Sequence, residues 1–200
     1  ETEETEETEE TEEPDKNTET EGESASTTVI EGAGYTEPTI TINGSTVTFP
    51  LSYADFKAFG FHISADDEVT EMENGYYTST TLYNAADEEM GYCYLSNRTD
   101  GTLNLSDCMV YGVSITYDSY YDVTTDVTMP TGVTMNSTKE DWLAAYGTPD
   151  YEYESDDYDS QEYTWYAHND AYYDDYQNSL EVSFWDGAVD EIDIRFIGWE

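Results

Sequence analysis

SLEVSFWDGAVDEIDIRF, residues 179–196, is the stretch that decides the fold. Apolar and polar side chains alternate on both sides of Asp186-Gly187, which predicts two antiparallel strands joined at that dipeptide. Asp-Gly is typical of a type I′ turn, because both central residues of that turn need a positive φ. The alternation then breaks near Asp190 or Glu191, where we expect a β-bulge. The stretch is therefore predicted to be a bulged β-hairpin.

This hairpin has an earlier counterpart in the chain. TLNLSDCMVYGVSITY, residues 102–117, aligns on residues 181–196, and TVTFPLSYADFKAF, residues 46–59, aligns on residues 132–145. Two matching blocks in the same order predict a tandem duplication. The apolar positions of the hairpin recur in the earlier copy and are expected in the core. Its acids do not recur and are expected on a solvated or partner-facing surface; they are Glu181, Asp190, Glu191 and Asp193.

Each copy is predicted to begin with a short helix. In STKEDWLAAYGTPD, residues 137–150, a Ser or Thr cap precedes an acid at the third helical position, and Gly147 with Pro149 ends the helix. The first copy repeats the scheme between Ser52 and Gly60. Helices this short do not persist alone, so each must pack on a sheet.

The sheet is predicted from alternating stretches at 76–83, 91–95, 102–105, 109–117, 162–167, 180–185 and 188–196. The fold class is therefore expected to be α+β, with two tandem repeats that each pack a short helix on an antiparallel β-meander. We assign residues 38–126 to repeat 1 and residues 127–200 to repeat 2. Residues 1–37 are expected to form a disordered acidic stalk.

The stalk is predicted from ETEETEETEETEEP, residues 1–14, which repeats Thr-Glu-Glu and contains no large apolar residue. Such a segment extends by self-repulsion and cannot form a core. A stalk of this kind usually follows a lipidated cysteine, so we expect a lipid anchor upstream of residue 1. The location is then extracytoplasmic, either cell-surface anchored or secreted. The alternative is a solubilising end with no further role.

The chain carries 47 acidic residues against 5 Lys and Arg, a formal net charge of −42. A field of this sign repels phosphate backbones and anionic lipid surfaces, and the sequence offers no basic cluster that would release counterions. Nucleic-acid binding is therefore excluded, and membrane contact is expected only through the lipid anchor.

A family resemblance is visible in the second copy. STKEDWLAAYGTPD, with the closing FWDGAVDEIDI, resembles the repeat of β-lactamase inhibitory proteins and of SmpA/OmlA-type small lipoproteins. The likeness covers most of copy two and, without the Gly-x-Pro, part of copy one; the stalk is similar to those of gut-type Gram-positive lipoproteins. It implies non-catalytic binding or assembly in the cell envelope. The acidic surface departs from the family pattern, so a β-lactamase partner is not implied.

Cys93 and Cys108 are the only cysteines. If Asp100-Gly101 closes a two-residue hairpin, they lie opposite each other and could form a disulfide in an oxidising compartment. If the turn lies at Asp107-Cys108 instead, they are separated and act as buried thiols. The sequence leaves both readings open.

Acids and aromatic residues are dense between residues 153 and 178. Carboxylate oxygens at this density could bind Ca²⁺, although the EF-hand spacing is absent and a solvated loop is the alternative. The candidate ligands are Asp156, Asp157, Asp159, Asp174 and Asp175. The aromatic residues suit sugar stacking or protein contact, unless they simply cover the sheet. They are Tyr158, Tyr163, Trp165, Tyr166, Tyr172, Tyr173 and Tyr176.

No catalytic motif occurs in the sequence, and no cofactor beyond Ca²⁺ is expected. The leading hypothesis is a non-catalytic extracytoplasmic binding lipoprotein that presents an acidic, tyrosine-rich surface to a protein or envelope glycan. The second is a secreted inhibitor of an extracellular enzyme, which follows from the resemblance. The third is a hydrolase, since catalytic residues can be scattered without a motif.

Overall fold

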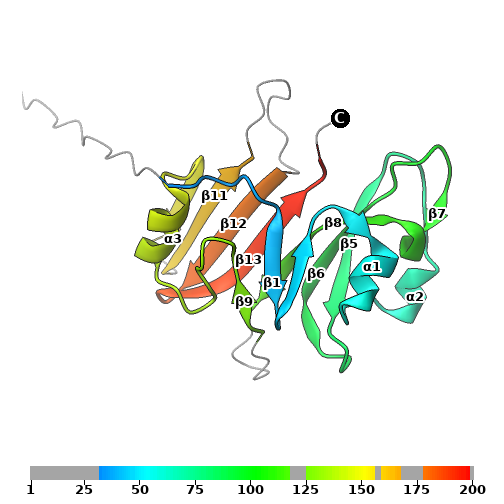
Figure 1. Ribbon diagram of the computed structural model, residues 1–200, viewed down its shortest axis with the longest axis horizontal. Helices are drawn as coiled ribbons and strands as arrows, with labels where there is room; N and C mark the ends of the chain where they lie inside the picture. The colour runs from blue at the N-terminus through cyan, green and yellow to red at the C-terminus, as the bar shows by residue number, and fades with distance from the viewer. Residues whose placement is uncertain (1–31, 118–124, 156–158, 168–177, 199–200) are drawn as a thin grey trace, which may run out of the picture.

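An eight-stranded antiparallel sheet dominates the computed structural model, which describes residues 32–117, 125–155, 159–167 and 178–198 (Figure 1). Seven of its strands follow the order β10-β11-β12-β13-β8-β6-β5, and β3 pairs with β8 beside them. Their bounds are β3 Leu51–Ser52, β5 Tyr77–Tyr83, β6 Glu89–Ser96, β8 Met109–Thr116, β10 Tyr151–Ser155, β11 Ser160–Tyr166, β12 Asn178–Trp185 and β13 Ala188–Phe196. The predicted α+β class with an antiparallel sheet is confirmed.

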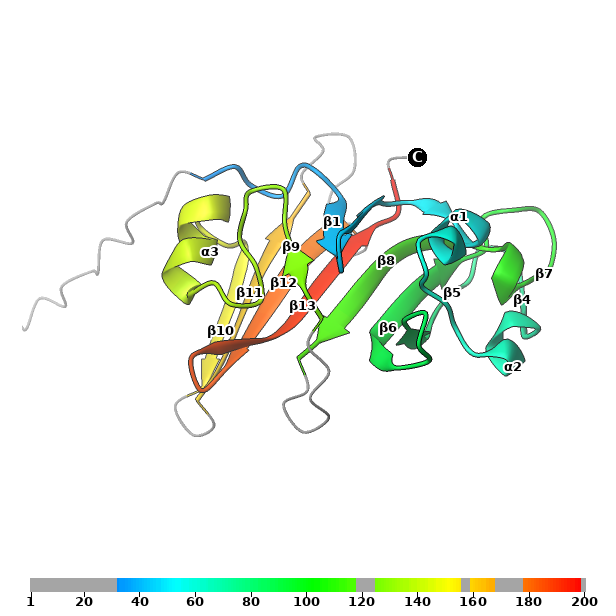
Figure 2. The ribbon, with the colours of Figure 1, turned by 60° about the horizontal axis from the view of Figure 1, so that its bottom comes forward.

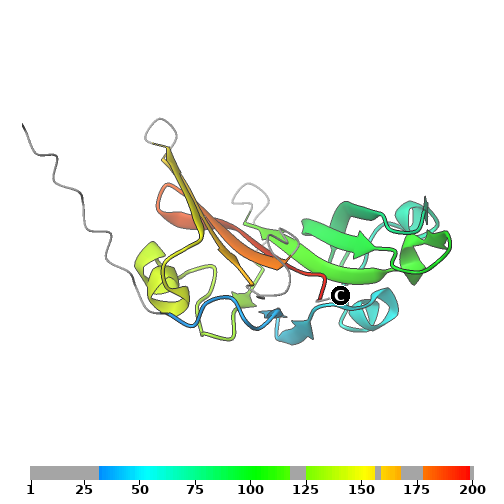
Figure 3. The ribbon, with the colours of Figure 1, turned by 90° about the horizontal axis from the view of Figure 1, so that it is seen from above.

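A second layer covers one face of this sheet. It consists of a three-stranded sheet in the order β2-β1-β9, with α1 and α3 on either side of it (Figures 1 and 3). The bounds are β1 Thr39–Ile42, β2 Ser45–Thr48, β9 Val127–Thr128, α1 Tyr53–Ala58 and α3 Lys139–Tyr146. The end of the molecule beside β5 is closed by α2 Ala65–Glu68, β4 Glu71–Met72, β7 Leu103–Asn104 and the 3-10 turn η1 Leu105–Asp107 (Figure 2).

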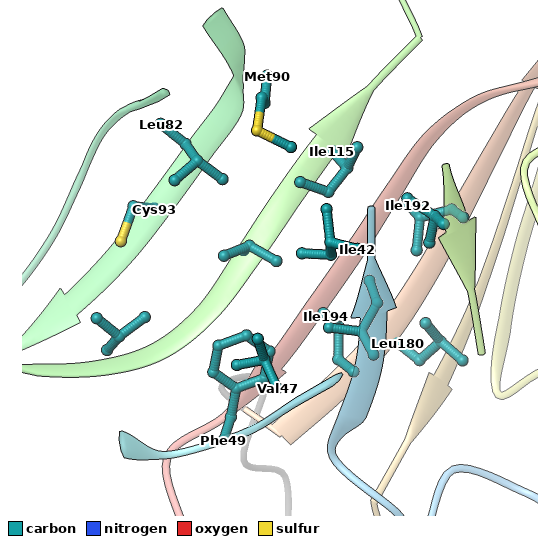
Figure 4. Packing of buried hydrophobic residues seen from close by; sticks show 14 of the residues in the cluster. Ile42, Val47, Phe49, Leu82, Met90, Cys93, Ile115, Leu180, Ile192 and Ile194 are labelled. Carbon is teal, nitrogen blue, oxygen red and sulfur yellow. The ribbon is translucent and has the colours of Figure 1, made fainter. Parts of the chain in front are cut away.

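The hydrophobic core lies between the two layers. Ile42 and Val47 of the small sheet pack over Ile115, Leu180 and Ile194 of the large one (Figure 4). All five side chains are fully buried. One cluster of buried residues runs through both halves of the chain, so the second layer is shared between them.

The helices begin where their caps predict. The Ser52 hydroxyl accepts a hydrogen bond from the Asp55 amide at 3.1 Å and caps α1. Thr138 and Asp141 form a reciprocal capping box at the start of α3. Each cap satisfies an amide that has no partner inside the helix, which fixes the first turn. None of the described helices is long and apolar enough to cross a membrane.

The hairpin of β12 and β13 has the predicted turn and bulge. Asp186 and Gly187 have φ values of 51° and 75°, as a type I′ turn requires. Ser183 lies opposite Glu191 and Phe184 opposite Val189, so Asp190 is the extra residue. The bulge keeps Val189 and the following apolar residues on the same buried face.

The cysteines do not lie opposite each other. Cys93 pairs across the sheet with Val113, because a 3-10 turn and the short strand β7 replace the two-residue hairpin considered at Asp100-Gly101. Cys93 and Cys108 are both buried free thiols. The structure therefore has the separated arrangement and no disulfide at these positions.

Residues 32–37, which the sequence placed in the stalk, lie against the second half of the chain. The amides of Ala33 and Gly34 donate to the carbonyls of Ala145 and Tyr146 at 2.9 and 3.1 Å. Tyr35 is buried, and its hydroxyl donates to the Arg195 carbonyl at 3.0 Å. Placing the stalk boundary at residue 37 was therefore wrong, because these contacts satisfy the last carbonyls of α3.

Candidate functional site

The face of the large sheet that points away from the small sheet and from α1 and α3 is the candidate site. Successive side chains of a strand point to opposite faces. Since Val182, Ile192 and Ile194 face the core, Glu181 and Asp193 project from the other side. We call this surface the open face, because no described helix or strand covers it (Figure 3).

Four acids gather at the centre of the open face and are called here the carboxylate strip. They are Glu162 of β11, Glu181 of β12, and Glu191 and Asp193 of β13. Glu181 lies directly opposite Asp193, and Ser183 lies between Glu162 and Glu191 on the neighbouring strands. Like charges placed across strands destabilise a sheet, so this arrangement has an electrostatic cost.

Asp193 is the best-satisfied member of the strip. Arg195 donates to its two carboxylate oxygens at 2.8 and 2.5 Å, and the Tyr94 hydroxyl donates at 2.5 Å. The Arg195 guanidinium also stacks over the Tyr94 ring, 4.5 Å from its centroid. Asp193 is only 3% exposed. Of the two surfaces expected for these acids, solvated or partner-facing, the solvated one does not hold for Asp193.

Burial raises the pKa of Asp193, although hydrogen bonds and charge from Arg195 and a hydrogen bond from Tyr94 oppose that shift. The same ion pair raises the pKa of Arg195, whose burial alone would lower it. Asp193 and Arg195 thus form a charge pair in the middle of the sheet, and among the described residues Asp193 is the one acid that forms a salt bridge with Arg195.

Glu181 is held partly protonated at neutral pH. Burial, and then the charges of Glu162 and Asp193, raise its pKa to about 7, against a smaller opposing effect of Arg195. Burial and the charge of Glu191 also raise the pKa of Glu162. Glu181 can therefore gain or lose a proton near neutrality, which a solvated glutamate does not do.

Exposed aromatic side chains flank the carboxylate strip on both sides. We call them the aromatic rim: Tyr77 and Tyr92 beyond Asp193, and Tyr151, Tyr153 and Trp185 beyond Glu181. Each is 46–54% exposed. Large aromatic residues exposed on one face are characteristic of interaction surfaces, because their rings give contact area at low entropic cost.

Two aromatic residues that the sequence nominated for binding are in the core instead. Tyr163 and Trp165 are each 2% exposed. The Tyr163 hydroxyl donates to Glu154 at 2.5 Å, and the Trp165 indole donates to the Gly147 carbonyl at 3.1 Å. Assigning these two to a binding surface was wrong, since the alternation of β11 turns them inward.

The other nominated aromatic residues divide between described and undescribed parts of the chain. Tyr166 is half-buried at the end of β11, where its amide donates to Asp150 at 2.8 Å. Four lie outside the described residues: Tyr158, Tyr172, Tyr173 and Tyr176. The exposed tyrosines of the rim come from other strands, and the sequence had not singled them out.

The nominated calcium ligands lie mostly outside the described residues, namely Asp156, Asp157, Asp174 and Asp175. Asp159 is described: it sits in a turn with φ of 49°, and its carbonyl accepts from the Asp186 amide at 3.1 Å. Within the described ranges, no three acidic, histidine or cysteine side chains converge closely enough to hold a metal ion. Calcium binding by the nominated acids stays a prediction.

Two clefts lie away from the open-face centre. One, of about 370 Å³, is lined by Lys57, His62, Ser64 and Glu68 among others. Its polar side chains already have partners: Lys57 pairs with Glu68 at 2.5 Å, and His62 Nε2 lies 3.0 Å from Asp87 Oδ1. The other, of about 470 Å³, lies beside β4 and β5. Neither includes a residue of the carboxylate strip.

Arg195 was the residue that could have indicated the site from the sequence. It is the only cation in the closing hairpin, two positions after Asp193, and residues two apart in a strand share a face. The sequence could not have placed Tyr94 and Ser114 in the same site, because their positions beside Asp193 depend on the pairing of β8 with β13 and β6.

Comparison of the chain with protein-family models, with curated proteins and with solved structures found no match.

Proposed function

We propose that the protein is a non-catalytic, extracytoplasmic binding lipoprotein that presents the open face to a protein or an envelope glycan. The observation that carries this proposal is the combination of an uncovered sheet face, an exposed aromatic rim and a central strip of acids. Exposed apolar surface on a folded domain marks interaction sites, and aromatic residues are enriched in such sites. Three of the four acids have no ion-pair partner among the described residues, so the polar or charged groups of a partner can pair with them.

We further propose that the sheet arose by duplication of a helix-plus-meander unit. The offset of 79 that aligns β8 on β13 places Tyr111 on Asp190, and both are the extra residues of β-bulges against the preceding strand. The same offset places Ser114 on Asp193, which lie opposite each other where the two strands pair. These correspondences support two repeats related by a pseudo-twofold axis between Ser114 and Asp193.

The tether is proposed from the Thr-Glu-Glu repeats alone. An extended acidic segment of this kind would hold the folded part away from a membrane surface, since like charges keep it stretched. The lipid anchor is tested by labelling producing cells with a radioactive fatty acid and immunoprecipitating the protein. Unlabelled protein in the culture medium would sink the anchor while leaving the binding face untouched.

The binding face is tested by retention of the purified protein on immobilised envelope protein and envelope glycan fractions. Replacing Tyr92 and Tyr153 by serine removes rim area on both sides of the strip, and we expect at least a tenfold loss of retention. Phe59→Ser is the matched control, because Phe59 is 42% exposed but lies after α1, away from the open face. Equal retention of both variants would overturn the assignment of the face.

The second candidate function is inhibition of an extracellular enzyme. It is favoured by the family resemblance and by the rigidity of a sheet face that is already formed before binding, which lowers the entropic cost of association. An inhibitor should give stoichiometric loss of turnover for one secreted enzyme. Binding without loss of turnover in any enzyme assayed would remove this candidate and leave the leading one.

A further inference from the structure

We propose that the open face recognises a protein segment that presents lysine or arginine side chains, which would insert between the aromatic rim and the carboxylate strip. This inference rests on the proposed binding function and names the chemistry of its partner. Three acids of the face have no ion pair among the described residues, and the face already holds one cation of its own, Arg195.

The uncompensated charge lies on Glu162, Glu181 and Glu191. Within the described part of the chain, these three carboxylates form no ion pair; the Ser114 hydroxyl donates to Glu191, and the Thr164 hydroxyl approaches Glu181 at 3.5 Å. Neutral hydroxyl donors leave the mutual repulsion of the three acids in place. A cation brought between them by a partner would relieve a cost that the free protein carries.

Arg195 shows how a cation fits on this surface. Its guanidinium contacts Asp193 through two nitrogen atoms while it stacks on the ring of Tyr94. An aromatic ring beside a carboxylate is favourable for arginine, since the ring face and the carboxylate both attract positive charge. Rim tyrosines stand beside acids in the same way elsewhere on the face: Tyr153 lies opposite Glu162, and Tyr151 opposite Thr164, the neighbour of Glu181.

Other occupants fit this surface less well. A neutral glycan could stack on the tyrosines but would leave the acids buried beneath it without a counter-charge, which is costly. A second copy of this chain would bring another strongly negative surface, at a net charge of −42 per chain. A partner segment with Lys or Arg side chains would pair its charges with the carboxylate strip and stack on the aromatic rim at the same time.

Binding of a cation should depend on pH, because Glu181 must be ionised to contribute. The charged groups that face Glu181 are Glu162 from β11 and Glu191, Asp193 and Arg195 from β13. Burial and these acids raise its pKa to about 7, and a bound cation would lower it again. If the bound cation returns the pKa of Glu181 to its ordinary value, this single group weakens binding by roughly 30-fold between about pH 8 and pH 5.5.

The test uses hexalysine and hexaarginine peptides as probes, with chitohexaose as the neutral sugar, and measures affinity by calorimetry at physiological ionic strength. The face variant is Glu162→Gln/Glu181→Gln/Glu191→Gln. The matched control Glu71→Gln/Glu73→Gln/Glu89→Gln removes the same charge from exposed positions outside the strip. Circular dichroism of each variant confirms that it is folded.

We expect the face variant to lose at least tenfold in peptide affinity and the control to lose less than twofold. The pH dependence should be weaker in Glu181→Gln than in the unmodified protein, and what remains comes from Glu162, whose pKa is also raised. Equal losses in both triple variants would show non-specific attraction to an acidic protein and would overturn the inference. Binding of chitohexaose with no preference for either peptide would overturn it too, while the proposed binding function would stand. Absence of all binding, together with unchanged envelope retention of the Tyr92 and Tyr153 variant, would sink both.

Discussion

Replacing Glu181 by glutamine should stabilise the fold at alkaline pH and not at acidic pH. The folded protein holds the pKa of Glu181 at about 7, against an ordinary value near 4.5. Between these two values the unfolded chain loses its proton while the folded one keeps it, so the folded state is penalised increasingly as the pH rises through this window. Below about pH 4.5 both states are protonated and the penalty vanishes.

The size of the effect follows from that shift. A shift of this size corresponds to about 3 kcal/mol for a group shielded from water. Glu181 is only partly buried, so solvent screening lowers the expected penalty to about 1–2 kcal/mol above pH 8. Glu181→Gln removes the charge and keeps the shape, and it should therefore raise the free energy of unfolding by about that amount.

Urea denaturation at pH 8 and at pH 4.5 measures the effect directly. Glu152→Gln is the matched control, because Glu152 is exposed on edge strand β10 and its replacement should change stability by less than about 0.5 kcal/mol. An equal gain from Glu181→Gln at both pH values would contradict the argument, since the gain would then come from packing and not from charge. Destabilisation at pH 8 would contradict it more strongly.

Two further predictions concern the sheet and the cysteines. Gly112→Ala should destabilise the protein by about 3 kcal/mol or more in urea denaturation, because a Cβ there would lie 2.3 Å from the Ile194 carbonyl oxygen on β13. Gly101→Ala is the control and should be nearly neutral, because a Cβ at that position meets nothing within 4 Å. Similar effects of the two substitutions would refute the close approach of β8 and β13. In the native protein, Cys93 and Cys108 should resist a thiol reagent at pH 8, because both are buried and burial raises the pKa of Cys108 to about 11. Both should react after denaturation. Absence of free thiols after denaturation without reductant would instead show a disulfide.

Local signals predicted the local parts of the fold. The Asp186-Gly187 turn, the bulge at Asp190 and the caps at Ser52 and Thr138 each depend on a few neighbouring residues, and each is present in the structure. A turn type or a cap is decided by backbone conformation and hydrogen bonds within one or two turns of chain. These features could therefore be predicted from single stretches of sequence.

Features that depend on distant strands were predicted poorly. The burial of Asp193 results from Tyr94 on a strand nearly one hundred positions earlier, whereas its sequence neighbours alone suggested a solvated or partner-facing acid. The separation of the cysteines results from a 3-10 turn that replaces the expected hairpin. Tyr35 is buried because it reaches the carbonyl of Arg195, a contact that the polar sequence around it concealed. The errors at Asp193 and Tyr35 came from long-range contacts with no local signal, and the error at the cysteines came from an irregular turn.

The open face differs between the halves in a way that argues for selection on binding. Under the proposed duplication, Tyr92 corresponds to Glu181, because Tyr92 lies opposite Ser114 and Glu181 lies opposite Asp193. One half thus carries an aromatic residue where the other carries an acid whose ionisation costs stability. A cost of this kind is not expected to persist at the centre of a sheet unless function requires it, since one change to glutamine would remove it. Glu181, whose ionisation the fold penalises, is therefore a position where a partner is expected to bind.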